Sequence, residues 1–409
     1  MQDTVTIPQE SSKAENSITG KILLVINADT SKQPNVPPDR SKERLADYTI
    51  LKTMLQGEIV DWNDINKTTW ARWLAKVGGK AMALAALAFA RRKRYQMFYC
   101  DAENNGLVLA ALLKLSRTKK PLFMIGHWVT PRKKALLIKR FRLQTHITTL
   151  FLHSTIQYKK ALEELAIPGD KLRILPYQVD TEFWNIENAS PEARAIPFDQ
   201  SLKPYICTAG LEFRDYPTLI EAMRELDIDL KIGAASHWSK RKNSSAEMEL
   251  PPNVNISKYN YVQLRDLYAG CRFVVVPLYD VDFQAGITLI LEAMSMGKAV
   301  IVTRSEGQGD TIVDQRKTTR HGPLRPTSGA FTELFGNNGN TRIEGRTGFY
   351  VSAGNAAELR GAINYLLEHP DVAEDMGRRA RITVESMMKV EHFGERISRA
   401  IAEVLEQSN

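Results

Sequence analysis

Cysteine is scarce in this sequence, with only Cys100, Cys207 and Cys271 among 409 residues. All three lie beside apolar runs, and a sparse, odd, buried set is typical of proteins from a reducing compartment. This scarcity argues against the disulfide framework of small secreted domains. The sequence also has no Cys and His spacing, and no Asp-x-Asp pair flanked by a strand, so no metal site is predicted.

Long uncharged apolar runs are lacking as well. The longest, Ala81–Ala90, is shorter than the about 20 residues that cross a bilayer. Residues 1–18 are polar and have no apolar centre, so they do not resemble a secretory signal. We expect residues 1–18 to form a disordered tail and the protein to be cytoplasmic. Any membrane contact is then peripheral, on the inner membrane face.

Acidic residues are few in the first part of the chain. Residues 1–150 carry 25 Lys and Arg against 12 Asp and Glu, and none of the acidic residues lies between Glu103 and Glu163. Such a basic half predicts a polyanionic partner, either anionic lipid headgroups or nucleic acid. No helix-turn-helix, zinc or stacking motif accompanies the charge, so specific nucleic-acid recognition is not expected. An anionic membrane surface is the expected partner.

Apolar strand-like runs alternate with helical patterns along most of the chain, which predicts parallel sheets covered on both faces. The fold class is therefore α/β, with two doubly wound, Rossmann-like domains that face each other across a cleft. In such sheets ligands bind outside the carboxyl ends of the strands. The expected strands lie near residues 21–26, 58–60, 96–100, 121–125, 148–152, 205–208, 230–232, 254–256, 273–276 and 299–302.

These patterns divide the chain into two expected domains of roughly equal size. The expected boundaries are an N-terminal domain over 19–185, a linker over 186–203, a C-terminal domain over 204–385 with a long loop insert at 315–346, and a C-terminal helix over 386–409 that crosses back to the first domain.

Residues 284–310, QAGITLILEAMSMGKAVIVTRSEGQGD, form the most informative stretch. They read as a loop, a helix that begins with small residues, and a buried strand. Free N–H groups at a helix start suit an anionic phosphate, and glycine allows close approach. The carboxylate of Glu292, eight positions after Gln284, can accept hydrogen bonds from sugar hydroxyls. The other interpretation of Glu292 is a carboxylate that favours the helix dipole.

The segment LEAMSMGKAVIVT within this stretch closely resembles the donor site of glycosyltransferase family 4. HSTIQYKKALEELAIPGDKLRILPYQVDTEFW is similar to the end of the N-terminal domain in that family, which commonly ends in Pro-Asn-Gly-Val-Asp; here Pro-Tyr-Gln-Val-Asp stands instead. The resemblance implies the GT-B fold and a nucleotide-sugar donor. It places Gln284 where the first of two glutamates usually stands. It implies ribose binding by Glu292, a sugar contact for Gln284, and backbone contacts from Ala285, Gly286, Ile287 and Thr288.

The segment YICTAGLEFRDYPTLIEAM looks like the first strand, loop and helix of the donor domain in the same family. Family members carry an Arg and a Lys there that neutralise the donor diphosphate. The resemblance puts Gly210 in the loop and Arg214 at the Lys position, while the Arg position is Glu212 or is lost to a shorter loop. An arginine can hold phosphate with two hydrogen bonds. The other interpretation is a surface Arg214 paired with Asp215.

Polar residues follow two strands of the expected N-terminal sheet. His127 comes directly after an apolar run, and family 4 enzymes often place a histidine there, facing the donor sugar; a structural histidine is the alternative. Asp101, Glu103 and Asn104 follow an earlier strand and are predicted to face the acceptor, with Glu103 as a binding or proton-accepting group. Alternatively, Asn105 simply caps the next helix.

Residues 69–94 combine tryptophan with cations at helical spacing. Trp70, Trp73 and Val77 belong to an apolar stripe that continues to Leu84, and Arg72, Lys76 and Lys80 form a basic stripe. This pattern suits a headgroup interface. The alternative, favoured for the apolar stripe, is a helix that covers its own sheet.

The residues and the resemblance together predict a retaining, metal-independent glycosyltransferase that uses a UDP- or GDP-sugar and needs no further cofactor. His127, Arg214 and Glu292 are the expected catalytic residues, and the expected acceptor is lipid-linked or lies at a membrane surface. Two alternatives remain: a nucleotide-sugar sensor or partner subunit that transfers nothing, and a basic membrane-associated scaffold.

Overall fold

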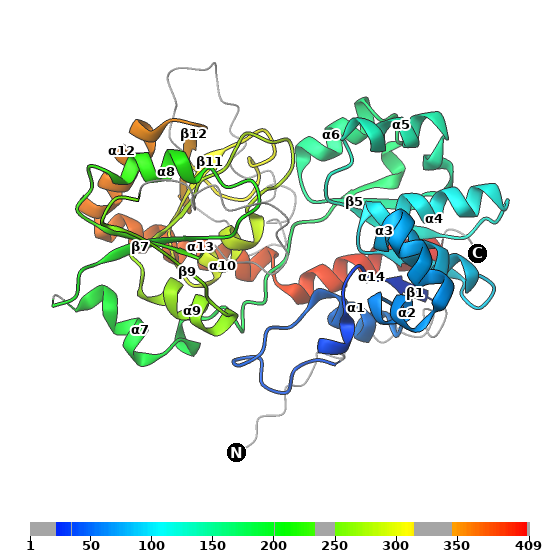
Figure 1. Cartoon of the computed structure of the whole chain (residues 1–409), viewed down its shortest axis with the longest axis horizontal. Coiled ribbons are helices and arrows are strands. Elements are labelled where there is room, and N and C mark those ends of the chain that lie inside the picture. The colour runs from blue at the N-terminus through cyan, green and yellow to red at the C-terminus, as the bar shows by residue number, and fades with distance from the viewer. Residues whose placement is uncertain (1–21, 34, 200, 234–249, 315–345, 407–409) are drawn as a thin grey trace.

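The computed structural model describes most of the chain as two α/β domains (Figure 1). The predicted tail at 1–18 and the predicted loop insert, apart from its last residue, lie outside the described residues. Those described are 22–33, 35–199, 201–233, 250–314 and 346–406.

The N-terminal domain is built on a six-stranded sheet of order β2-β1-β3-β4-β5-β6. Every neighbouring pair in it is parallel. Its strands are β1 Ile22–Val25, β2 Glu58–Val60, β3 Met97–Cys100, β4 Leu122–Gly126, β5 Thr149–Leu152 and β6 Leu172–Ile174; its helices are α1 Asp47–Leu55, α2 Trp62–Lys67, α3 Thr69–Ala90, α4 Glu103–Leu115, α5 Arg132–Arg140 and α6 Thr155–Glu163.

The C-terminal domain repeats this design with a second parallel sheet, of order β12-β11-β10-β7-β8-β9. Its strands are β7 Tyr205–Ala209, β8 Asp229–Gly233, β9 Val254–Ser257, β10 Val274–Val276, β11 Val300–Arg304 and β12 Gly348–Ser352. The helices of this half are α7 Pro191–Ala195, α8 Tyr216–Met223, α9 Tyr261–Gly270, α10 Ile287–Ser295, α12 Ala356–Glu368, α13 Pro370–Met387 and α14 Val390–Glu406.

Both sheets are buried on both faces, which confirms the predicted fold class. In β1, Leu23 packs into one apolar core and Leu24 into another, because successive side chains point to opposite faces. A strand covered on both faces has no polar side, so it reads as a continuous apolar run. The ten predicted strands are all present. The two that were not predicted, β6 and β12, are the outer strands at one edge of each sheet.

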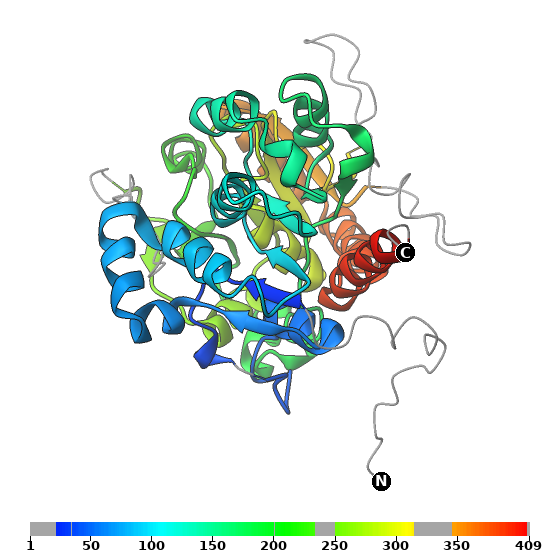
Figure 2. The same cartoon turned by 90° about the vertical axis from the view of Figure 1, so that its right-hand side faces the viewer.

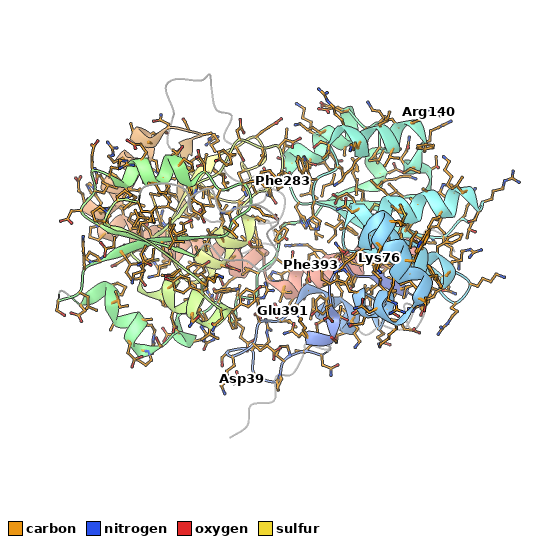
Figure 3. The ribbon with its side chains drawn as sticks, viewed as in Figure 1. Asp39, Lys76, Arg140, Phe283, Glu391 and Phe393 are labelled. Carbon is orange, nitrogen blue, oxygen red and sulfur yellow. The ribbon has the colours of Figure 1, made fainter. Side chains whose placement is uncertain are left out.

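The last helix joins the two domains. Helix α14 packs against α1, and its Phe393 and Ile397 lie in the same apolar core as Leu24 of the N-terminal sheet. Its Glu391 pairs with Arg40, which also binds the buried Asp180 of the Pro-Tyr-Gln-Val-Asp segment. Figure 3 shows Glu391 and Phe393 on this helix between the two domains.

Helix α3 differs from the favoured interpretation of its apolar stripe. Its second half is core, with Leu84 fully buried, whereas Trp70, Trp73 and Val77 in the first half are exposed. The helix breaks at Gly79, whose φ of 83° and ψ of 164° are not helical. Only the second half therefore covers the sheet. Among the described residues, α3 is the one helix whose length and composition would allow it to cross a membrane, and 28% of the relevant window is buried.

Candidate active site

A cavity of about 300 Å³ lies at the carboxyl ends of the C-terminal strands. The loop after β7 and the loop between β10 and α10 line it. Gly210 and Gly286 have φ values of +96° and +75°, a backbone conformation that favours glycine. A Cβ on Gly210 would lie 2.6 Å from Nη2 of Arg214, so glycine keeps room for the guanidinium. The lining residues are Gly210, Leu211, Glu212, Phe213, Arg214, Phe283, Gln284, Ala285, Gly286, Ile287 and Thr288.

The guanidinium of Arg214 forms part of the cavity wall. Its Nε donates to the carbonyl of Ala209 at 3.0 Å and its Nη1 to that of Glu212 at 2.9 Å. The side chain is buried, and burial lowers the pKa of Arg214. Within the described part of the chain no carboxylate pairs with it. Asp215 instead caps α8 by accepting from Thr218, so the predicted alternative of a surface Arg214–Asp215 pair is wrong.

The start of α10 lies beside Arg214 in the cavity wall, since a Cβ on Gly286 would lie 3.3 Å from Nη1 of Arg214. Gly286 is the N-cap residue and provides no side-chain cap, so the N–H groups of the first turn have no partner within the helix. Ile287 and Thr288, which supply two of these groups, line the cavity. A buried cation and a helix start, facing one space, form an electropositive site for an anion such as phosphate.

Gln284 has both polar side-chain atoms buried, and neither has a hydrogen-bond partner among the described residues. The residue is 8% exposed. Buried amides almost always form hydrogen bonds, so an orphaned one points to a group that is not part of the protein. Gln284 also lines a second, adjoining cavity of about 150 Å³, which Ile287 and Phe283 line as well.

The second cavity lies between the two domains. From the N-terminal domain it is lined by His127, His153, Ser154, Gln157 and Tyr177.

The two histidines of this cavity have fixed positions. The rings of His127 and His153 lie 5.1 Å apart, and the ring of Tyr177 lies 4.5 Å from that of His153. His127 Nε2 contacts the carbonyl of Asp101 at 3.0 Å. Burial lowers the pKa of His153 to about 3, so this ring is neutral. The structure thus brings His127 and Gln284 to one small space.

The three predicted acceptor-side residues, Asp101, Glu103 and Asn104, have different surroundings in the structure. Glu103 is buried; one carboxylate oxygen accepts the N–H of His127 at 2.9 Å and the other pairs with Lys134. It therefore positions His127 and is not free to bind an acceptor in this conformation. Asp101 accepts from the N–H of Asn27 at 2.7 Å, and burial raises its pKa to about 6. Asn104 is exposed.

The alternative for Asn105 is also wrong. The helix begins two residues earlier than predicted, at Glu103, with Ala102 as its N-cap. Asn105 lies inside the first turn, where its amide donates to Asp101 at 2.9 Å.

Glu292 lies on α10 but lines neither cavity. It accepts a hydrogen bond from the hydroxyl of Tyr268 at 3.2 Å. Burial raises the pKa of Glu292 to about 7, opposed by the nearby charge of Arg44, by Tyr268 and by Arg214. Arg44 reaches this position from the N-terminal domain and lies over the ring of Tyr261, 4.7 Å from its centroid. The structure therefore does not bring Glu292 into one cavity with Gln284.

Contacts of Asp282 hold the two domains together beside the cavities. Its carboxylate accepts from Trp128 Nε1 and Thr130 Oγ1, both at 2.7 Å, and from Lys160 Nζ at 3.0 Å. The Trp128 ring stacks on that of Phe283, with 4.7 Å between centroids. Figure 3 shows Phe283 on the side of the C-terminal domain that faces the N-terminal one.

Trp128, His153, Tyr177 and Asp282 are among the residues here that were not predicted from the sequence. Helix α6 begins beside His153, with Ser154 as its N-cap, and the ring of His153 lines the cavity. Trp128 directly follows His127 and Asp282 lies two positions before Gln284, and both His127 and Gln284 were predicted site residues. This proximity in the sequence is the signal that could have identified Trp128 and Asp282. Among the described residues, no cluster of His, Cys, Asp and Glu could hold a metal ion.

Comparison with known proteins gives a fold for the chain and a family match for part of it. Residues 213–369 match the family model described as glycosyl transferases group 1. HepE of Anabaena, in complex with UDP and glucose, is 14% identical with a TM-score of 0.62, over 93% of this chain and 99% of that one. A glycosyltransferase of Rickettsia africae is 16% identical with a TM-score of 0.62, over 94% and 98%.

Sucrose-phosphate synthase of Thermosynechococcus elongatus is 16% identical with a TM-score of 0.61, over 80% of this chain and 79% of that one. No curated protein sequence matches the chain. At these identities the structural likeness establishes the fold. The chain has the GT-B fold, and its residues 213–369 are similar to the glycosyl transferases group 1 model.

Proposed function

We propose that the protein transfers a sugar from a nucleoside-diphosphate sugar to an acceptor hydroxyl. One observation carries the proposal: the buried guanidinium of Arg214, which has no paired carboxylate among the described residues, and the uncapped start of α10 line the same 300 Å³ cavity. A diphosphate in that cavity supplies the missing negative charge. Residues 213–369, which include this site, match a glycosyltransferase family, and HepE was crystallised with UDP.

The proposed reaction follows from this charge arrangement. The bond between the anomeric carbon and the diphosphate oxygen breaks, and the electron pair leaves with the diphosphate. Arg214, the N–H groups of Ile287 and Thr288 and the helix dipole stabilise the departing charge. The acceptor oxygen forms the new bond and its proton passes to the departing phosphate oxygen. In this proposal these groups balance the charge of the diphosphate without a metal ion. The acceptor attacks from the side of the leaving group, so the anomeric configuration is retained.

The small cavity between the domains is proposed to hold the sugar. Of the three residues that line both cavities, Gln284 is the one with a polar side chain, and its amide is free to bind sugar hydroxyls. His127 faces the same space with its position set by Glu103. Glu292, buried beside Tyr268, is proposed to bind ribose once the ligand enters. UDP and GDP are the two donor nucleotides proposed.

The acceptor is proposed to be lipid-linked and reached at the cytoplasmic surface of a membrane. The excess of Lys and Arg in residues 1–150 supports this, since cations near an anionic leaflet favour adsorption.

Thermal unfolding with UDP, GDP and other nucleoside diphosphates, and with their sugar conjugates, tests the function. A ligand that binds only the folded state at a hundred times its dissociation constant adds about 2.7 kcal/mol of stability. We expect one nucleotide to raise the melting temperature of the wild type. Arg214→Gln should bind it about tenfold to a hundredfold more weakly, because hydrogen bonds to charged groups are strong. Arg224→Gln, an exposed arginine on the same domain, is the matched control. No response to any nucleotide in folded protein would contradict the proposal.

The uncharged Gln284 favours one other function. An amide cannot offset positive charge on the sugar during bond cleavage, so a protein that binds nucleotide sugar as a sensor or partner subunit is the second candidate. Donor hydrolysis and transfer separate the two, because a sensor binds the donor and releases neither free sugar nor product.

A further inference from the structure

The first half of α3 is an exposed helical arm. Between Thr69 and Lys80 only Ala71 is buried, with Leu74 and Ala75 partly so. The second half carries the buried Ala83, Leu84, Ala85, Leu87 and Ala88. The break at Gly79 joins the two halves, and nothing lies within 4 Å of a Cβ built there. Figure 2 shows α3 at the outer edge of the N-terminal domain.

The arm exposes large apolar side chains on one face. Trp70, Trp73 and Val77 are 46%, 64% and 63% exposed. Their spacing of three and then four residues puts them side by side on the helix. Tryptophan with its apolar body and polar N–H is favoured at the boundary between lipid and water. Three neighbouring exposed apolar side chains of this size form an apolar patch of the kind that marks an interaction site.

The arm and its surroundings are cationic. Arg72 and Lys76 are exposed and lie one helical turn apart. Lys80 is also exposed, but it follows the break at Gly79 and its Nζ lies 3.3 Å from the centroid of the Trp62 ring. No Asp or Glu occurs between Asp64 and Asp101, a stretch with eight Lys and Arg. Figure 3 shows Lys76 on this helix. The helix has an apolar face with cations beside it and carries no acidic residue. Such a helix complements an anionic surface that has an apolar layer beneath it.

We infer that the first half of α3 docks the protein on an anionic lipid bilayer, with Trp70, Trp73 and Val77 entering the headgroup boundary and Arg72 and Lys76 facing lipid phosphates. The helix lies in the plane of the interface and does not cross the bilayer, because its second half is part of the protein core. This inference names the surface that the proposed membrane acceptor requires, and it rests on that part of the proposed function.

Vesicle flotation tests the docking directly. The probes are vesicles of phosphatidylcholine alone and of phosphatidylcholine mixed with phosphatidylglycerol. We expect binding to the anionic vesicles only, weakened by salt. Trp70→Ser with Trp73→Ser should reduce binding at least about tenfold. Arg72→Gln and Lys76→Gln should each reduce it about fivefold at low salt. In the wild type, vesicles should shift tryptophan emission to shorter wavelength.

Two controls make the test specific. Ile382→Ser removes an exposed apolar residue on α13 of the other domain, and Arg224→Gln removes an exposed cation there. Both should bind vesicles like the wild type. All these positions are exposed, and unfolding curves verify that each variant folds.

Several results would overturn the inference. The first is unchanged vesicle binding by the Trp70 and Trp73 variant. The second is loss of binding only on substitution of Leu136 and Phe141, the exposed apolar residues at α5. The third is binding of nucleic acid but not of vesicles. The fourth is a wild-type protein that is dimeric in solution while the Trp70 and Trp73 variant is monomeric. Nucleotide affinity is measured in the same samples without lipid, so a failure of docking leaves the transferase proposal standing and is told apart from its failure.

Discussion

At the scale of single residues, burial separates the polar groups of the cleft into satisfied and unsatisfied ones. Glu103 is fully engaged by His127 and Lys134, whereas Gln284 has no partner for either polar atom among the described residues. An unsatisfied buried amide costs free energy that a bound ligand can restore. The satisfied group is a positioning residue and the unsatisfied one is a candidate for contact with the ligand.

Gln284→Ala should separate sugar recognition from nucleotide recognition. The variant loses hydrogen bonds to the sugar and keeps Arg214 and the start of α10. We expect the affinity for the nucleotide sugar to fall about tenfold while that for the free nucleoside diphosphate stays unchanged. Calorimetry with both ligands measures this. An equal loss for the two ligands would place Gln284 on the diphosphate.

Glu292 should make stability depend on pH. Its pKa rises from an ordinary 4.5 to about 7 in the folded state. Between these values the unfolded chain binds fewer protons at this carboxyl than the folded protein does. The free energy of unfolding therefore falls as the pH rises from 4.5 to 7, by about 3 kcal/mol in all, and this contribution is constant above 7.

Glu292→Gln removes that titration. We expect the variant to gain stability relative to the wild type as the pH rises from 5 to 8, by up to about 3 kcal/mol. Urea unfolding at several pH values measures the difference in free energy of unfolding between the variant and the wild type. All other titrating groups are the same in both proteins, so their contributions cancel. A difference that does not change with pH would mean that Glu292 ionises at its ordinary value.

At the scale of elements, the start of α10 depends on the backbone of one glycine. Gly286 has φ +75°, and a Cβ there would lie 3.0 Å from side-chain atoms of Leu278 and Val276. The Gly286 backbone turns the chain so that the first N–H groups of the helix face the cavity. Any other residue must change that turn.

Gly286→Ala should therefore cost about 1–3 kcal/mol of stability and also abolish nucleotide binding. Gly361→Ala is the matched control, since Gly361 lies inside α12 with nothing within 4 Å of a Cβ. Alanine there should stabilise by up to about 1 kcal/mol and leave binding intact. Denaturant unfolding and nucleotide titration measure both. Retained affinity in Gly286→Ala would remove α10 from the proposed site.

At the scale of the whole molecule, Asp282 connects the domains beside the proposed site. It belongs to the C-terminal domain and its three donors, Trp128, Thr130 and Lys160, belong to the N-terminal one. A second contact lies nearby, where Asp310 accepts from the N–H and hydroxyl of Thr155. These contacts set the space in which His127 and Gln284 meet.

Asp282→Ala should loosen this arrangement without affecting the nucleotide cavity. We expect a larger radius of gyration in X-ray scattering, unchanged affinity for the nucleoside diphosphate, and slower transfer, because the small cavity needs both domains. Asp280→Ala is the control, since Asp280 accepts from the N–H of Glu306 within its own domain. Weakened nucleotide binding in Asp282→Ala alone would show that the donor cavity also depends on the N-terminal domain.

The amino-acid sequence by itself determined the two parallel sheets, ten of their strands and the loops that line the larger cavity. The physical reason is that buried strands, helix periods and glycine turns are local patterns. β6 carries a weak pattern because one of its three residues is buried, whereas β12 has four buried residues of five but begins two positions after the predicted loop insert. The local sequence pattern also could not show that only the second half of α3 belongs to the hydrophobic core.

The tertiary structure alone decided which polar groups are free to bind a ligand. Arg214 was expected to pair with phosphate or with Asp215, and burial together with the cap on α8 decided against Asp215. His153 and Asp282 became part of the site through contacts between residues far apart in the chain, such as the 154 positions from Trp128 to Asp282. Whether a polar group is satisfied depends on such distant partners, so the three-dimensional packing of the two domains determines it.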